Sequence, residues 1–208
     1  MLREIIVPFR FKGKRSYVHG TDIYDSMLEM VLDYFGEYPD SVKGSFHGLL
    51  ENNGIFRIYE SGEPLGDEQL FAFFTIVMKS KTYQIALLSA ETPISSSYEY
   101  DKQKVLENML IKDETITMQF KSTYTYMEQI VSMTKKLHMT IYPGAKGKWL
   151  FTKIHINNAV DSALYPGKLL SVQAERNFQN KLTRCSIKLD DQPVGSIFFS
   201  LTPQKETT

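Results

Sequence analysis

The sequence has little sulfur, no net charge and no long apolar run, and each shortage excludes a class of protein. A single cysteine, Cys185, excludes an intramolecular disulfide and a cysteine-rich metal site, and it favours a reducing compartment. The 24 basic and 24 acidic residues cancel, so no global charge points to nucleic acid or to an anionic membrane. No stretch approaches the roughly 20 apolar residues of a membrane span, and the start, "MLREIIVPFRFKGKR", is unlike a signal peptide. These absences predict a soluble cytoplasmic protein that binds no nucleic acid.

Two stretches that the sequence does contain are similar to each other. "TDIYDSMLEMVLDYFG" begins at Thr21, and "TYTYMEQIVSMTKKLH" begins at Thr123. At an offset of 102 residues, apolar positions of the first fall on those of the second with helical spacing. Further on, "FFTIVMKSKTYQIALLSAETP" matches "TRCSIKLDDQPVGSIFFSLTP" at an offset of 110. The common order of these matches favours a duplicated unit. The alternative is that two ordinary helix-then-sheet segments lie half a chain apart.

Each half has the same predicted order of elements, namely a short strand, one helix and then several strands. We expect helices over 22–35 and 125–138, because Pro39 and Pro143 prevent easy continuation. His138 then ends the second helix, where a cation is favourable. The runs that follow are rich in β-branched and aromatic residues, and no second long helix provides parallel crossovers. The fold class is therefore α+β, with a helix on an antiparallel sheet in each half.

The chain divides into a first half over 1–93, a linker over 94–114 and a second half over 115–208. Within the linker, "ISSSYEYD" is typical of a connecting segment, and "KQKVLENMLI" has apolar residues at helical spacing. The linker therefore predicts a connecting helix. The helix of the first half has a second apolar stripe that the other helix lacks, so we expect it to be the more completely buried of the two.

This organisation resembles the hot-dog fold, in which one long helix is wrapped by an antiparallel sheet, and two such units in tandem resemble a double hot-dog. The resemblance covers nearly the whole chain and depends on element order and duplication, not on a diagnostic motif. It implies binding of an acyl thioester of coenzyme A or of an acyl-carrier protein. It also implies 3-hydroxyacyl dehydratase or acyl thioesterase activity, in fatty acid or polyketide metabolism, without a cofactor. A homo-oligomer is compatible with it.

The resemblance implies a catalytic role for His19, which lies just before the first helix. Hot-dog dehydratases have a histidine there as a base, and a carboxylate on a central helix as its partner. Asp25 and Glu29, at i and i+4, share one helix face and are candidates for the acid, and Glu128 is the candidate from the second helix. The Pro- and Gly-rich segment around the dehydratase histidine is missing here. A thioesterase needs only a helix carboxylate, so Glu29 or Asp25 would serve without His19. The alternative is that these acids form a solvated helix face.

Four basic residues, Arg10, Lys12, Lys14 and Arg15, surround Gly13 within six positions. Basic groups on a loop bind phosphates such as those of coenzyme A or of a carrier-protein arm. The alternative is a solvated edge strand protected by lysines. The histidines lack the spacing of a metal site, so no metal is expected. For the chain as a whole, the alternative to an enzyme is a non-catalytic binding or assembly protein on the same scaffold.

Overall fold

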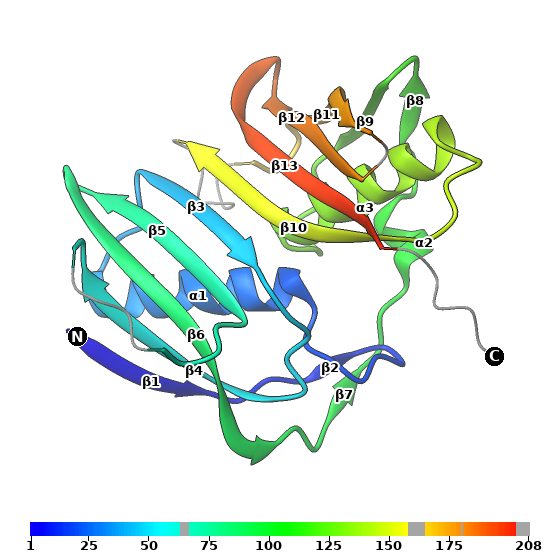
Figure 1. Cartoon of the computed structure of the whole chain (residues 1–208). Helices are drawn as coiled ribbons and strands as arrows, with labels where there is room; N and C mark the ends of the chain where they lie inside the picture. Colours follow the sequence, from blue (N-terminus) through cyan, green and yellow to red (C-terminus); the bar gives the residue numbers. More distant parts are fainter. Residues whose placement is uncertain (63–66, 158–164, 180, 203–208) are drawn as a thin grey trace. The chain divides into compact units, whose positions relative to one another are not determined.

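The structure is a computed structural model that describes four stretches of the chain: residues 1–62, 67–157, 165–179 and 181–202 (Figure 1). By their internal contacts these residues form two compact units. The first consists mainly of Met1–Asp101, and the second contains Lys102–Ile156 and the C-terminal part of the chain. The boundary between Asp101 and Lys102 falls within the segment 94–114, which the sequence marks as a linker.

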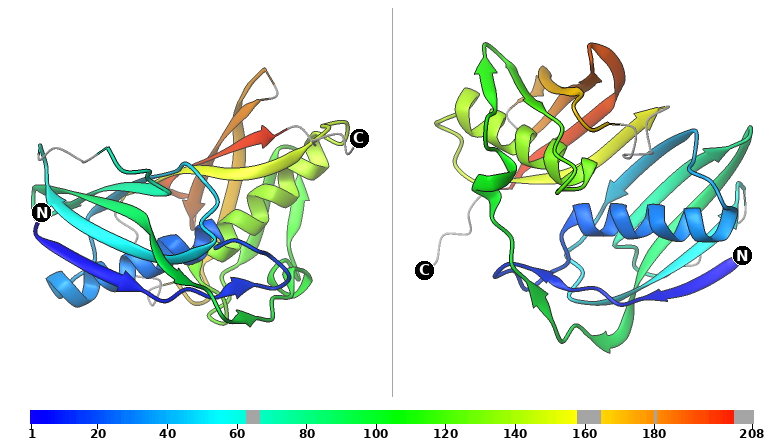
Figure 2. Two further views of the ribbon diagram at one scale, coloured as in Figure 1. Left: turned by 60° about the horizontal axis from the view of Figure 1, so that its bottom comes forward. Right: turned by 180° about the vertical axis from the view of Figure 1, so that it is seen from behind.

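The first unit is a five-stranded antiparallel sheet with one long helix against it (Figure 2). The sheet order is β1-β4-β6-β5-β3, so β1 forms an edge. Two short strands, β2 and β7, pair in parallel beside this sheet. In chain order the elements are β1 (Arg3–Val7), β2 (Phe11–Lys12), α1 (Gly20–Phe35), β3 (Ser41–Phe46), β4 (Asn52–Glu60), β5 (Ala72–Met78), β6 (Lys81–Pro93) and β7 (Ser97–Tyr98).

The core of the first unit lies between α1 and the sheet. The helix ends at Phe35 because Gly36 adopts a left-handed conformation, with φ of 77°, and its N–H donates to the carbonyl of Leu32 at 2.8 Å. Tyr24 of α1 meets Phe74 of β5 edge-on, with ring centroids 6.4 Å apart. The buried residues of α1 recur at helical spacing, and they are Thr21, Ile23, Tyr24, Met27, Met30 and Val31.

The second unit has the same composition of one long helix and an antiparallel sheet. Its sheet order is β10-β13-β12-β11-β9-β8, so the short strand β8 lies on the outer side of β9. In chain order the elements are α2 (Lys102–Val105), β8 (Leu110–Lys112), β9 (Thr115–Gln119), α3 (Tyr126–Ile141), β10 (Lys148–Asn157), β11 (Leu169–Phe178), β12 (Leu182–Leu189) and β13 (Gln192–Thr202). The connecting helix is a single turn, α2, since the rest of the stretch predicted as helical forms turns and β8.

The two sheets place their last hairpin differently. In the first unit, β5 pairs with β3, and β6 pairs with β4. In the second unit, β13 pairs with β10, and β12 pairs with β11. The sequence matches β5 to β12 and β6 to β13, so the matched strands have opposite neighbours. The two strands of a hairpin pair with each other whichever of them faces a given neighbouring strand. Local sequence similarity therefore does not reveal which neighbour each hairpin strand has.

The two long helices are equal in length, and one expectation about them is wrong, namely that the first is the more buried. Both have 16 residues, and they begin at Gly20 and Tyr126, which gives an offset of 106 where the sequence match used 102. The second helix is the more buried one, because the polar side chains of Gln129, Ser132 and Thr134 are also buried. Their hydrogen bonds permit this: Gln129 binds the preceding loop, and Thr134 donates to the carbonyl of Ile130 at 2.7 Å.

His138 is also placed differently from the expectation. The helix continues one turn beyond it, to Ile141, and its side chain is fully buried. The ring lies 4.6 Å from the ring of Trp149 and 5.4 Å from that of Phe199, centroid to centroid. Burial in these apolar surroundings lowers the pKa of His138 from 6.5 to about 4. His138 is therefore a neutral core residue and not a cation at the helix end.

Candidate active site

A groove of about 440 Å³ runs between the edge strand β1 and one flank of α1 in the first unit. Every second residue of β1 faces the groove, as the period of a strand requires, and α1 contributes residues at helical spacing. Two carboxylates and one guanidinium lie among apolar side chains there. The lining residues are Arg3, Ile5, Val7, Ser26, Glu29, Met30, Asp33 and Tyr34.

The structure places Glu29 in this groove and brings Asp33 beside it. The two acids are four residues apart, so they lie on the same face of α1, and both are exposed. Asp25 is half-buried and is not one of the lining residues. Sequence reasoning missed Arg3 and Asp33. The signal for Asp33 was its i+4 spacing from Glu29, and the signal for Arg3 was its alternation with Ile5 along β1.

A second polar centre lies at the N-terminus of α1, and we call it the Lys12 network. It consists of Lys12, His19, Thr21, Asp22 and Tyr98. Lys12 is fully buried, and its Nζ donates to Thr21 Oγ1 and to Asp22 Oδ1, both at 2.9 Å. The Tyr98 hydroxyl donates to Asp22 Oδ2 at 2.9 Å, which attaches β7 to the start of the helix. The ring of Tyr100 lies 4.5 Å below the same ammonium, a favourable place for a buried cation.

His19 belongs to this network and not to the groove. It is the N-cap residue of α1, and its Nδ1 lies 2.8 Å from Thr21 Oγ1. Thr21 Oγ1 is in turn 2.9 Å from Asp22 Oδ1. A helix rises 1.5 Å per residue, so Glu29 lies about 15 Å further along the axis. His19 is therefore linked through Thr21 to Asp22, whereas Glu29 lies further along the helix.

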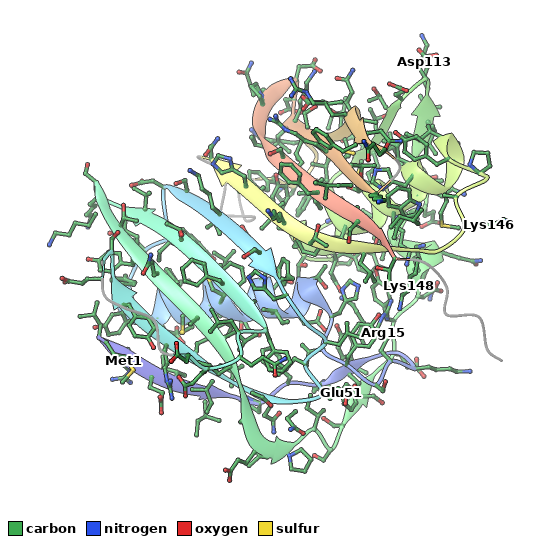
Figure 3. All side chains as sticks on the ribbon, in the orientation of Figure 1. Met1, Arg15, Glu51, Asp113, Lys146 and Lys148 are labelled. Carbon is green, nitrogen blue, oxygen red and sulfur yellow. The ribbon has the colours of Figure 1, made fainter. Side chains whose placement is uncertain are left out.

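The basic residues around Gly13 separate into one buried and three more accessible side chains. Lys12 is enclosed and paired with Asp22, so we remove it from the set expected to bind phosphate. Arg10 and Lys14 are exposed, and Arg15 is half-buried. Arg15 is labelled in Figure 3. Arg10 donates to the carbonyl of Ser97 at 3.0 Å, and Arg15 donates to that of Lys12 at 2.8 Å. Gly13 permits this turn because its φ is 63°.

Glu128, the candidate from the second helix, has a local structural role. Its backbone N–H donates to Thr125 Oγ1 at 3.1 Å, and its carboxylate accepts from the Thr125 N–H at 3.0 Å. This reciprocal pair is a capping box. A carboxylate near a helix N-terminus is also stabilised by the helix dipole. The capping box thus gives Glu128 a structural role at the start of α3.

Two side chains of reactive types, His138 and Cys185, lie close together in the core of the second unit. His138 Nε2 lies 3.5 Å from Cys185 Sγ, and both residues are fully buried. Burial raises the pKa of the Cys185 thiol to about 12, so the thiol stays protonated and unreactive at neutral pH. Cys185 is therefore a small core residue.

Among the described residues, no helix is both long enough and apolar enough to cross a bilayer. Nor do three or more His, Cys, Asp or Glu side chains in these stretches gather in a way that suits a metal ion.

The sequence matches no protein-family model and no curated protein. Several solved structures do match over nearly the whole chain. A tesB protein from Mycobacterium avium subsp. paratuberculosis has a TM-score of 0.54 at 10% identity, covering 96% of this chain and 93% of the other. The dehydratase domain of PpsC from Mycobacterium tuberculosis, in complex with C12:1-CoA, has 0.53 at 10%, covering 96% and 92%.

A monomeric dehydratase domain from a trans-AT polyketide synthase split module has a TM-score of 0.52 at 10% identity, covering 97% of this chain and 100% of the other. At such identities the likeness shows the fold. Each unit also has the single long helix on an antiparallel sheet that the sequence predicts. The prediction of fold is thereby confirmed, and the chain has the tandem architecture of a double hot-dog.

Proposed function

We propose that this protein binds an acyl thioester and hydrolyses it in the groove between β1 and α1, with Glu29 as the base. The observation that carries the proposal is an exposed helix carboxylate lining a groove whose other walls are largely apolar. A volume of about 440 Å³ is within the range of small-molecule sites, roughly 300–1,000 Å³. Glu29 is the one residue of the expected catalytic set that lines this groove.

The chemistry follows from the groove lining. An acyl chain packs against Ile5, Val7 and Met30, which brings its thioester toward the helix. Glu29 accepts a proton from a water molecule, whose oxygen attacks the carbonyl carbon. The C–S bond then breaks, and the protonated Glu29 returns the proton to the leaving thiolate. The products are a carboxylic acid and a free thiol. Arg3 supplies positive charge on the opposite wall, where negative charge develops on the carbonyl oxygen.

The remaining basic residues, Arg10, Lys14 and Arg15, are proposed to contact phosphate groups of the thiol carrier. Their guanidinium and ammonium groups suit phosphate oxygens. The carrier is coenzyme A or an acyl-carrier protein. We also propose that the protein is located in the cytoplasm. The dehydratase domain of PpsC, similar in fold, was solved in complex with C12:1-CoA, which supports a coenzyme A thioester as the first ligand to test.

A second candidate function is dehydration of a 3-hydroxyacyl thioester with His19 as the base. The observation in its favour is the hydrogen-bonded link from His19 through Thr21 to Asp22. Dehydration removes a proton and a hydroxyl group and releases an enoyl thioester with the C–S bond intact. A non-catalytic protein that only binds the thioester is the third alternative.

The decisive experiment supplies acyl- and 3-hydroxyacyl-coenzyme A of several chain lengths and follows free thiol and enoyl product separately. We expect thiol release, and a loss of about 10²–10⁴-fold in kcat/KM for Glu29→Gln. The matched control is Glu91→Gln, which removes an exposed carboxylate at the end of β6, away from the groove. Enoyl product that depends on His19 would favour dehydration. Binding without either product would leave the non-catalytic alternative.

A further inference from the structure

The groove between β1 and α1 has charged side chains of both signs toward one of its ends. Figures 1 and 2 show that the two elements run in opposite directions within the first unit. The chain that leaves β1 at Val7 reaches the start of α1, where Lys12 Nζ donates to Thr21 Oγ1 at 2.9 Å. Arg3, at the other end of β1, therefore lies toward the end of the helix, where Asp33 also lines the groove.

Glu29 and Asp33 stand one turn apart on the same face of α1. Since a helix rises 1.5 Å per residue, Asp33 is about 6 Å further along the axis than Glu29. Both side chains are exposed, so both can meet a ligand in the groove. The proposed hydrolysis places the thioester carbonyl beside Glu29, and the inference below rests on that placement.

The acyl group then extends from Glu29 toward Asp33. The basic residues proposed to contact the carrier, Arg10, Lys14 and Arg15, precede α1 in the chain and lie toward its first turn, with Lys12. A carrier held there approaches the thioester from the start of the helix. The acyl group on the other side of the carbonyl carbon therefore points toward the end of the helix.

That end of the groove has one charge of each sign on facing walls, since Asp33 comes from the helix and Arg3 from the strand. Asp33 repels a carboxylate in the ligand, and Arg3 repels a cation. A hydroxyl group suits both walls, because it donates to a carboxylate and accepts from a guanidinium. The guanidinium has five N–H donors, so Arg3 can serve this hydroxyl group as well as the carbonyl oxygen.

The spacing of the two acids sets the position of the hydroxyl group on the acyl chain. A fully extended chain advances roughly 3.3–3.6 Å over the three bonds of one residue, so about five bonds span 6 Å. Methylene groups between the two polar ends pack against Ile5 and Met30, which line the groove. We infer that Asp33 determines specificity, and that the groove prefers thioesters of short acyl groups with a terminal hydroxyl group about five bonds from the carbonyl carbon.

The test compares equilibrium binding of two coenzyme A thioesters, hexanoyl and 6-hydroxyhexanoyl, by titration calorimetry. The full chain with Glu29→Gln is used, so that hydrolysis is slow. We expect the hydroxylated thioester to bind about tenfold more tightly, because a hydrogen bond to a charged group has this magnitude or more. Equal affinities, or no binding of either thioester, overturn the inference.

Two further thioesters of the same length test the charge argument. Adipoyl-coenzyme A has a terminal carboxylate, and 6-aminohexanoyl-coenzyme A has a terminal ammonium. We expect both to bind more weakly than the hydroxylated thioester. If either binds at least as tightly, one charge of the groove dominates and the inference is wrong.

A second substitution in the same protein tests the role of Asp33. With Asp33→Ala we expect the tenfold preference for the hydroxyl group to disappear, whereas the matched control Glu91→Ala, which removes an exposed carboxylate from β6, should keep it. A preference that survives Asp33→Ala contradicts the inference. If that variant does not fold, the comparison of the four thioesters still decides.

The inference and the proposed hydrolysis fail separately. Thiol release by the wild-type protein without any preference for the hydroxyl group refutes the inference alone. Preferential binding without thiol release refutes hydrolysis by Glu29 alone.

Discussion

The two long helices start in different ways, although they are equal in length. The start of α3 is held locally, by the capping box between Thr125 and Glu128. The start of α1 is held by distant parts of the chain, since Asp22 is bound by Lys12 from β2 and by Tyr98 from β7. Asp22 and Glu128 both occupy the third helical position. The same position thus serves helix capping in one unit and a buried ion-pair network in the other.

The flanks of the two helices also differ, both in burial and in charge. Aligned on their first residues, Asp25 and Ser26 of α1 correspond to Val131 and Ser132 of α3. The first pair is half-buried, and the second pair is buried. The acids of the groove in the first unit have no acidic counterparts, because Lys135 is at the position of Glu29. The comparison teaches that both helices have a buried apolar stripe, whereas the acidic flank is found on α1.

The largest effect on stability is expected from breaking the Lys12–Asp22 pair. Lys12→Met leaves an ionised carboxylate that is only 16% exposed without its cation, which costs roughly 3–5 kcal/mol of unfolding free energy. Denaturant unfolding measures this loss. Lys14→Met, two residues away and exposed, is the control and should change little. Adding Asp22→Asn to Lys12→Met should recover part of the loss, and equal midpoints for Lys12→Met and wild type would refute the network.

The second unit should show its own sensitivity to pH through His138. The pKa of His138 is about 4 in the folded protein against an ordinary 6.5, so the unfolded chain binds more protons between these values. The contribution of neutral His138 to the free energy of unfolding is therefore fully present above pH 6.5. It is lost as pH decreases toward 4, by on the order of 3 kcal/mol. Denaturant midpoints at pH 7 and pH 4.5 test this. In the His138→Leu protein the denaturant midpoint should change less between these two pH values. An equal change in both proteins would contradict the prediction.

A smaller effect is expected at Gln129, which corresponds to the apolar Ile23 in α1. Gln129 accepts from the backbone N–H of Lys121 and donates to its carbonyl, both at 2.9 Å. Gln129→Leu leaves these groups without partners and should cost about 1–3 kcal/mol in denaturant unfolding. Gln192→Leu, at an exposed position of β13, is the control. A stability gain in Gln129→Leu would show that an apolar residue is tolerated in both helices.

The smallest effect should come from the local cap of α3. Thr125→Ala removes the hydroxyl that accepts from the Glu128 N–H, and caps of this kind are worth about 1 kcal/mol. Thermal unfolding compares it with Thr123→Ala, which changes an exposed threonine before the helix. The difference between this loss and that of Lys12→Met measures how differently the two helix starts are held. Losses of similar size would remove the distinction.

The sequence by itself determined the elements and the fold class. Strands β11 and β12 lie in the region after the second helix where the sequence predicts strands, and both helices cover the predicted stripes, because the periods of strands and helices are local properties. It also indicated Glu29 as a helix carboxylate.

The tertiary structure alone decided what surrounds these residues. It paired Lys12 with Asp22, which neutralised a lysine expected at the surface, and it buried His138 in an apolar core. It also placed Arg3 opposite Glu29 and set different strand orders in the two sheets. Each of these depends on contacts between residues far apart in the chain, for which a local pattern has no information.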